Sequence, residues 1–155
     1  MIPRRKGVQI AKDTLRQETI VCGSLILSLR IETLSNLLFE VALPGEVPER
    51  LTIHCIKEAK RKLSEYEIPR PTHLRAADFA AALMDIPEGT TLTYGHLAKR
   101  LGSSPRGIAS RCSANRLLIR IPCHRVISNQ GIGGYNAGID WKKALLRLEA
   151  KSRFA

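Results

Sequence analysis

The sequence predicts an α+β protein in which a small α/β unit is followed by a mainly helical unit. Runs rich in Ile, Val and Leu between turn residues favour strands in the first half. Segments with helical periodicity and capping residues dominate the second half. The Pro-rich stretch 68–71 cannot continue a helix, so we interpret it as a linker. The 155 residues are therefore expected to form domains at 1–70 and 71–155.

The first unit is expected to contain two strands and one helix. Residues 19–29 and 37–43 have the composition of strands, and Pro44-Gly45 marks a turn. Pro48 can occupy the first turn of the helix that follows. The apolar residues with helical spacing are Leu51, Cys55, Ala59 and Leu63.

The second unit is expected to begin with two helices. Residues 75–84 are Ala-rich and amphipathic, and the helix stops before Pro87. A second helix is predicted over 94–101, with Thr93 as its N-cap and Gly102 as its C-terminal stop.

A third helix follows after a turn of three residues. Ser103 or Ser104 can cap it, Pro105 suits its first position, and it runs to about Ser113. Two short helices joined in this way make a helix-turn-helix, although an ordinary corner between two helices has the same pattern.

The positive charge is concentrated in the second half. The formal net charge is +11, and residues 75–155 contribute 13 Lys/Arg against 5 Asp/Glu. No acidic residue lies between Glu88 and Asp140. A solvated basic face would explain this, but with a helix-turn-helix it favours a nucleic-acid partner. The residues expected to contact DNA are Ser104, Pro105, Arg106, Gly107, Ser110, Arg111 and Arg125.

The C-terminal segment is expected to carry a reactive cysteine. Residues 117–121 are an extended apolar run that would be buried and would lead to Pro122-Cys123-His124. A turn-rich stretch follows, and Asp140 can cap a last helix over 141–150. The residues of that helix expected to pack inward are Ala144, Leu145 and Leu148.

Cys123 is the candidate nucleophile. A thiol reacts as its thiolate, so it needs a base or a positive neighbour at neutral pH. His124 adjoins it, and Glu149 is a candidate to orient that imidazole. Adjacent residues of an extended chain point to opposite faces, so contact between them requires a turn or an intervening water. A Cys-His pair alone more often marks a buried thiol.

Several short motifs taken together resemble the O6-alkylguanine-DNA alkyltransferase family, the methylated-DNA–protein-cysteine methyltransferases. They are Tyr94-Gly95, Arg106, Asn115, Pro122–Val126, Gly133–Tyr135 and Glu149. The likeness covers residues 75–155, whereas the first half shares only size and α/β character. The resemblance implies an RNase H-like first domain and a winged-helix-like second domain.

The resemblance also implies a role for each matching residue. Cys123 would accept an alkyl group from O6 of guanine, and possibly from O4 of thymine, in one turnover per molecule. His124 would act as base through a water, with Glu149 orienting it, and Tyr94 would hydrogen-bond the departing guanine. Asn115 would join the recognition helix to the active-site segment.

Further roles concern the extruded base. Arg106 would fill the gap that the flipped nucleotide leaves in the duplex. The base pocket would include Val126, Tyr135 and Asn136. Asn136 stands where the family commonly has serine, and Ala137 where it commonly has glycine, which predicts a narrower pocket that disfavours bulky adducts.

Other expectations concern cofactors, partners and location. No cofactor is needed, since the alkyl group comes from the lesion. No CxxC pair occurs, so a metal site of Cys22, Cys55 and His54 is less favoured than buried thiols. No apolar run reaches the ~20 residues that span a bilayer, and we expect a cytoplasmic monomer that acts on double-stranded DNA.

Two other functions explain part of the sequence. A helix-turn-helix regulator would explain the charge but not the segment around Cys123. A cysteine hydrolase would use the thiol, but no oxyanion-hole signature is visible.

Overall fold

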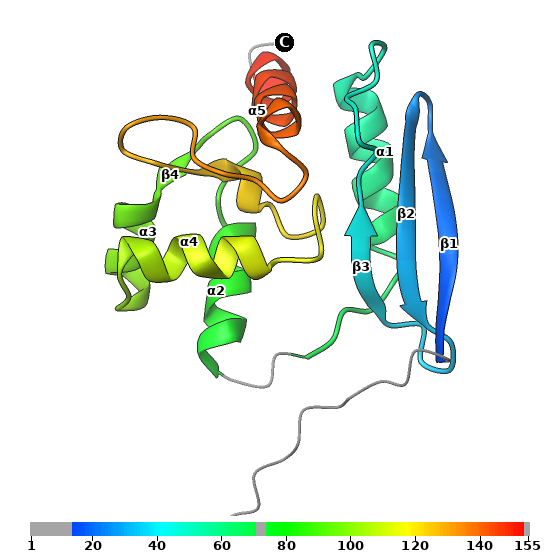
Figure 1. Cartoon of the computed structure of the whole chain (residues 1–155), viewed down its shortest axis with the longest axis horizontal. Helices are drawn as coiled ribbons and strands as arrows, with labels where there is room; N and C mark the ends of the chain where they lie inside the picture. Colours follow the sequence, from blue (N-terminus) through cyan, green and yellow to red (C-terminus); the bar gives the residue numbers. More distant parts are fainter. Residues whose placement is uncertain (1–13, 71–73, 154–155) are drawn as a thin grey trace, which may run out of the picture.

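The computed structural model describes residues 14–70 and 74–153 and has a mixed α/β fold. A three-stranded sheet and one helix form one side of the molecule, and the remaining helices gather on the other side (Figure 1). The basic N-terminal segment and the predicted linker residue Pro71 lie outside the described residues.

The sheet is an antiparallel meander in the order β1-β2-β3. It consists of β1 (Leu15–Cys22), β2 (Leu25–Glu32) and β3 (Leu38–Ala42). The prediction of one strand over 19–29 is wrong, because Gly23 adopts φ +59° and the chain reverses there. Alternate residues of β2 are buried, so one face of the sheet supplies the core.

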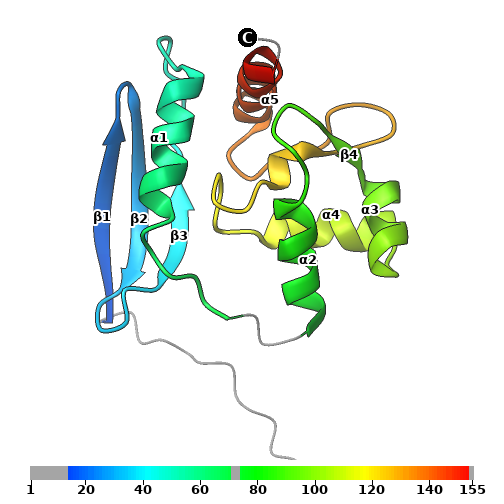
Figure 2. The ribbon, with the colours of Figure 1, turned by 180° about the vertical axis from the view of Figure 1, so that it is seen from behind.

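Helix α1 (Ile53–Leu63) packs against the sheet (Figures 1 and 2). The Thr52 hydroxyl accepts a hydrogen bond from the backbone N–H of Cys55, which caps the helix. Pro48 therefore lies outside the first turn, contrary to the prediction. Cys55, Ala59 and Leu63 are buried at the predicted helical spacing.

Helices α2 (Leu74–Met84), α3 (Tyr94–Leu101) and α4 (Pro105–Ala114) form close to their predicted bounds. Thr93 caps α3, and Ser104 rather than Ser103 caps α4 by accepting from the N–H of Gly107 at 3.0 Å. Gly102 ends α3 in the left-handed conformation. The apolar side chains of these helices form a second core cluster, which includes Phe79, Leu83, Leu97 and Ile108.

A short parallel pairing connects distant parts of the second half. Strand β4 (Leu92–Thr93) pairs with β5 (Val126–Ile127). Nothing in the sequence pattern indicated these two-residue strands. Their pairing places the start of α3 beside the segment that carries Cys123.

The predicted extended run at 117–121 is wrong. The Arg120 N–H donates to Leu118 O at 2.8 Å around Ile119, whose φ is +69°. The Cys123 N–H donates to Ile121 O at 2.8 Å around Pro122. These i to i+2 bonds are γ-turns, and they coil the chain into the 3-10 turn η2 (Cys123–Arg125).

Helix α5 (Ile139–Arg153) joins the two sides of the molecule. Its Trp141 indole donates to Pro44 O at 2.8 Å, and Leu145 belongs to the core of the sheet. The helix starts earlier than predicted, so Asp140 lies within its first turn instead of capping it. Among the described residues, no helix is long and apolar enough to cross a membrane.

Candidate active site

Cys123 is buried at the start of η2, with 4% of its surface exposed. The side-chain amide of Asn115 donates to Cys123 Sγ at 3.2 Å and to Ile121 O at 3.0 Å. The carbonyl oxygen of the same side chain accepts from the N–H of Leu117 at 3.0 Å. One amide therefore ties the end of α4 to the segment that delivers the thiol.

The environment keeps the thiol of Cys123 protonated. Burial raises its pKa, and the Asn115 amide and the Lys142 ammonium offset only part of this effect. A reaction that needs the thiolate at neutral pH therefore needs a base beside the thiol.

His124, which follows Cys123 in the chain, forms a buried pair with Glu149. His124 Nε2 lies 2.8 Å from Glu149 Oε1. Burial opposes ionisation of Glu149, but hydrogen bonds from His124 and Arg125 overcome it and hold its pKa well below the usual range. The carboxylate can only accept, so Nε2 carries the imidazole proton and Nδ1 holds a lone pair.

The second ring nitrogen of His124 is available for chemistry. Nδ1 is buried and has no hydrogen-bond partner among the described residues. Burial lowers the pKa of His124, although Glu149 opposes this. The imidazole is therefore neutral at neutral pH, with an Nδ1 lone pair that can accept a proton; the role of base stays a prediction.

Arg125 does not lie on the surface, so its predicted contact with DNA is wrong. Its guanidinium donates through Nε and Nη2 to Glu149, both at 2.9 Å, and through Nη1 to Ile86 O at 2.7 Å. Lys60 of α1 also reaches Glu149, with Nζ 3.3 Å from Oε1. The role of Arg125 is to neutralise a buried carboxylate.

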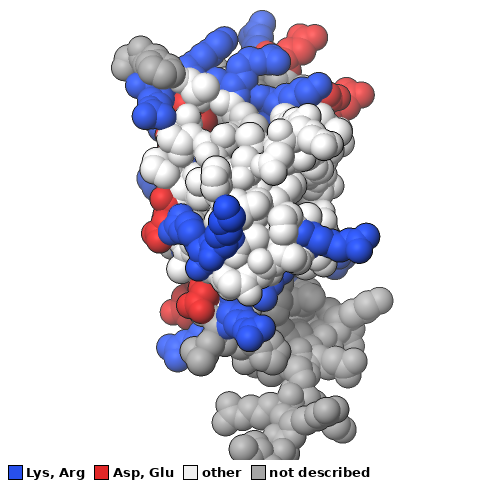
Figure 3. Space-filling model, turned by 90° about the vertical axis from the view of Figure 1, so that its left-hand side faces the viewer, with Lys and Arg blue, Asp and Glu red and all other residues white. Residues whose placement is uncertain are grey.

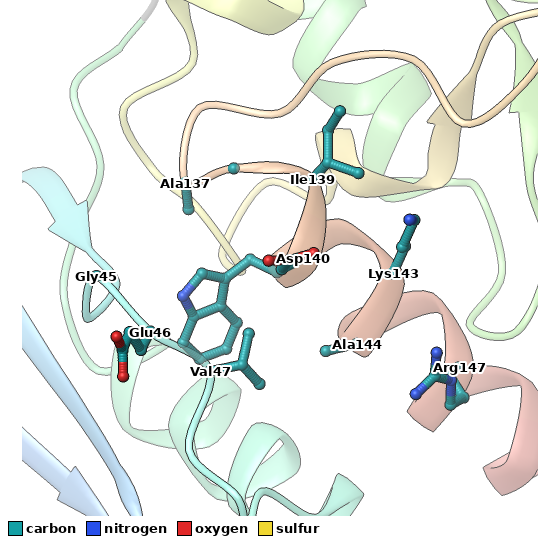
Figure 4. Close-up of a pocket in the computed structure, with 11 residues that line it drawn as sticks. Gly45, Glu46, Val47, Ala137, Ile139, Asp140, Lys143, Ala144 and Arg147 are labelled. Atoms are coloured by element: carbon teal, nitrogen blue, oxygen red, sulfur yellow. The ribbon is translucent and has the colours of Figure 1, made fainter.

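A cavity of about 310 Å³ opens beside Cys123. Its lining includes the predicted pocket residues Tyr135 and Asn136, together with Tyr94 and Cys112. The lining does not include Val126, whose side chain is fully buried. A larger cavity of about 730 Å³ lies between loop 45–47 and the start of α5, away from the thiol (Figure 4).

The pocket wall depends on a close approach at Gly133. This residue adopts φ +74°, and a Cβ there would lie 2.8 Å from the Tyr94 hydroxyl. Burial raises the pKa of Tyr94, so its phenol keeps its proton and can donate. The Asn136 amide donates to Ser113 O at 2.9 Å and to Asn115 O at 2.8 Å, which fastens the pocket loop to the end of α4.

Lys142 is the site residue that sequence reasoning missed. Its side chain is fully buried, and Nζ donates to Val126 O at 2.7 Å and Gly134 O at 3.0 Å. The ammonium also lies 5.9 Å from the centre of the Tyr94 ring. A lysine in an amphipathic helix is normally solvated, so helical periodicity could not reveal it. Cys112 was also unassigned, and burial raises its pKa to about 12.

The predicted DNA-contact residues of α4 mostly face solvent. Ser104, Pro105, Arg106 and Ser110 are exposed. Arg111 instead lies towards α2, with its guanidinium 5.7 Å from the Phe79 ring centre. On the face shown in Figure 3, Lys and Arg side chains lie at the top and across the middle of a largely uncharged surface.

No group of three His, Cys, Asp or Glu in the described part of the chain is placed to hold a metal ion. Cys22 and Cys55 are free and buried, whereas His54 is exposed. The alternative metal site of Cys22, Cys55 and His54 is therefore not formed.

Comparison with known proteins identifies relatives of the chain. A family model described as 6-O-methylguanine DNA methyltransferase, DNA binding domain, matches residues 75–151. A methylated-DNA–protein-cysteine methyltransferase of Methanopyrus kandleri is 32% identical over 124 residues, which cover 72% of this chain and 95% of that protein. A methylated-DNA–protein-cysteine methyltransferase of Saccharolobus solfataricus is 45% identical over 83 residues. This match covers 51% of this chain and about half (55%) of that relative's length.

Solved structures show the same fold. The crystal structure of Mycobacterium tuberculosis O6-methylguanine methyltransferase matches with a TM-score of 0.65 at 26% identity, covering 88% of this chain and 93% of that one. The O6-methylguanine-DNA methyltransferase from Pyrococcus kodakaraensis matches with a TM-score of 0.58 at 24% identity, covering 87% and 98%.

The fold and the site define a protein with a buried cysteine beside two short, capped helices. The chain belongs to the methylated-DNA–protein-cysteine methyltransferase family.

Proposed function

We propose that the protein repairs DNA by moving the alkyl group of O6-alkylguanine, and in particular a methyl group, onto Cys123 Sγ. The observation that carries this proposal is the buried arrangement of Cys123, His124 and Glu149, in which His124 Nδ1 keeps a free lone pair. Family membership supports the same reaction.

The reaction begins with the proton of the thiol. His124 Nδ1 takes it through one water molecule, and the Glu149 carboxylate, which Arg125 holds in place, stabilises the imidazolium. The thiolate then attacks the alkyl carbon in line, a C–S bond forms, and the C–O6 bond breaks. The electron pair of the broken bond stays on guanine, which takes the proton of the Tyr94 phenol, and the proton that left the thiol returns from His124 through water to restore that phenol.

The product limits the protein to one turnover. The alkylated cysteine is a thioether, and none of the residues placed around Cys123 provides a means of hydrolysing it. The alkyl acceptor is therefore consumed. Asn136 lines the pocket and would narrow it, whereas Ala137 lies outside the lining, contrary to the prediction. Methyl transfer should therefore be faster than transfer of bulky groups, and O4-alkylthymine is a second candidate substrate.

Double-stranded DNA is the proposed partner, bound by a monomer. The family model covering residues 75–151 describes a DNA-binding domain, and the exposed N-terminal turn of α4 suits a groove. Within the proposal, residues 1–70 form an RNase H-like domain and 71–155 a winged-helix-like domain. Contacts would come from α4 through Ser104, Pro105, Arg106, Gly107 and Ser110.

Mass spectrometry tests the proposed reaction. After incubation with duplex DNA containing O6-methylguanine, Cys123 should gain one methyl group, and excess lesion should remain unrepaired. Cys123→Ser should bind the duplex but clear no lesion. Repair by that variant would contradict the proposal, and repeated turnover by the unmodified protein would favour a hydrolase.

The Arg106→Ala variant tests whether Arg106 fills the gap that a flipped nucleotide leaves in the duplex. Unstacking a base costs a few kcal/mol, so Arg106→Ala should lower the single-turnover repair rate by about tenfold or more and duplex affinity by less. The matched control is Lys99→Ala, an exposed cation on α3, which should weaken binding without this loss of rate. Equal losses of rate and affinity in Arg106→Ala would contradict the assigned role.

A further inference from the structure

A small cationic cavity lies beside the segment that carries Cys123 but does not include the thiol. Its volume is about 160 Å³. Three of its lining side chains are apolar and three are cationic, and none is acidic: Met84, Ile119 and Pro122, and Lys60, Arg120 and Arg125. Liquid water occupies about 30 Å³ per molecule, so the cavity has room for a small polyatomic ion.

Arg120 is the cation that remains unpaired in this cavity. Its Nε is buried and has no hydrogen-bond partner among the described residues. No ion pair of Arg120 is formed within that part of the chain, in contrast to Lys60 and Arg125. Buried donors in native proteins are almost always paired with protein, water or an ion.

The backbone holds Arg120 in this position at a cost. The preceding Ile119 is fully buried with φ +69°, a conformation that a β-branched residue rarely adopts. The γ-turn around it directs the chain so that Arg120, which interrupts an apolar stretch, lines the cavity. Strain of this kind persists where surrounding contacts or a function maintain it.

The charges around the cavity do not balance. Lys60 and Arg125 pair with Glu149, and Lys60 also lies 3.5 Å from Glu88. Neither carboxylate lines the cavity. Two carboxylates thus oppose three cations, and the uncompensated charge belongs to Arg120.

We propose that this cavity binds a small tetrahedral oxyanion, with inorganic phosphate as the representative ligand. The Arg120 guanidinium would donate the principal hydrogen bonds, because its planar fork matches phosphate oxygens. Lys60 and Arg125 would supply further positive charge. The three cations come from α1, the γ-turn segment and η2, so the anion would tie the sheet side of the molecule to the helical side.

Calorimetric titration with sodium phosphate, at ionic strength held constant with sodium chloride, tests this proposal. The full-length protein should bind phosphate at one saturable site, and its melting temperature should rise with phosphate concentration. Arg120→Leu should weaken binding by about tenfold or more, because a charge-assisted hydrogen bond is lost. Arg120→Lys, which keeps the charge without the fork, should bind with intermediate affinity.

Arg116→Leu is the matched control. Arg116 is exposed in the same segment and does not line the cavity, so this variant should bind phosphate as the unmodified protein does. Absence of saturable binding, equal affinity in Arg120→Leu, or an equal loss in Arg116→Leu would each overturn the proposal. Binding of an undamaged duplex tests whether the cavity instead binds a phosphate group of DNA. If Arg120→Leu weakened duplex binding as much as phosphate binding, the ligand would be a phosphate of the DNA backbone and the proposal would fail.

Discussion

The two sides of the molecule differ in what they bury. The core between the sheet and α1 is apolar. Charged residues on this side of the molecule form ion pairs near the surface, as Arg16 does with Glu18. The fully or nearly buried charged and imidazole groups of the described residues all come from the second half: His124, Arg125, Lys142 and Glu149. Burying charge is costly unless each group is paired. The first half therefore contributes mainly an apolar core, with Lys60 its one described contact to Glu149, whereas the second half buries charged groups around one thiol.

Removing the charge of Glu149 should have the largest effect on both stability and repair rate. Glu149→Gln would leave Arg125 buried without its counter-charge and would give His124 a neutral amide oxygen in place of a carboxylate. We expect a loss of about 3–5 kcal/mol in the free energy of unfolding and a single-turnover rate reduced about 10²–10⁴-fold. Urea denaturation and quenched-flow repair assays measure both quantities.

Glu18→Gln is the control from the other side of the molecule. Its carboxylate is about one-third exposed and pairs with Arg16, so its loss should cost about 1 kcal/mol or less. Similar costs for the two variants would contradict the contrast between the two sides.

A substitution that creates a cavity in the core under the sheet should lower stability without changing the repair rate. Leu27 is fully buried on β2, so Leu27→Ala should lower the free energy of unfolding by about 2–5 kcal/mol. The single-turnover rate of the folded fraction should stay unchanged. A rate that fell in proportion to stability would show that the sheet takes part in the reaction.

Lys142→Met should have a smaller effect on stability and should also change the pH dependence of the repair rate. The substitution leaves the carbonyls of Val126 and Gly134 without their donor, which costs about 1–3 kcal/mol. It also removes a cation that lowers the pKa of Cys123, so the rate against pH should shift to higher pH. Lys143→Met, at an exposed neighbour, should change stability by no more than about 0.5 kcal/mol. An unshifted pH profile would leave Lys142 a purely structural role.

The second half should also contribute to the pH dependence of stability. The pKa of His124 and that of Glu149 are both lowered by folding, so the unfolded chain binds more protons, and stability should fall below about pH 6.5 and further below about pH 4.3. The pKa of Cys123 is raised, so stability should also fall as pH rises above about 8.5. Urea midpoints across pH test this. A Cys123→Ser variant that kept the full alkaline loss would contradict the second assignment.

Local sequence was sufficient for the elements whose signals lie within a few residues. Thr93, Ser104 and Gly102 marked the ends of α3 and α4, because capping depends on adjacent backbone groups. The Cys123–His124–Glu149 group was also predicted, through motif resemblance. The reversal at Gly23 was missed, since its apolar flanks continue the composition of a strand.

The sequence by itself determined the class of fold and the capped helices and indicated the candidate nucleophile, because each depends on local or ordered patterns. Only the tertiary structure decided that Arg125 is buried against Glu149, that Lys142 lies behind the pocket and that two γ-turns present the thiol. A charged side chain is expected to be exposed when only the sequence is known. Such a side chain is buried only where a distant segment supplies a partner for it, and the sequence pattern does not show that partner.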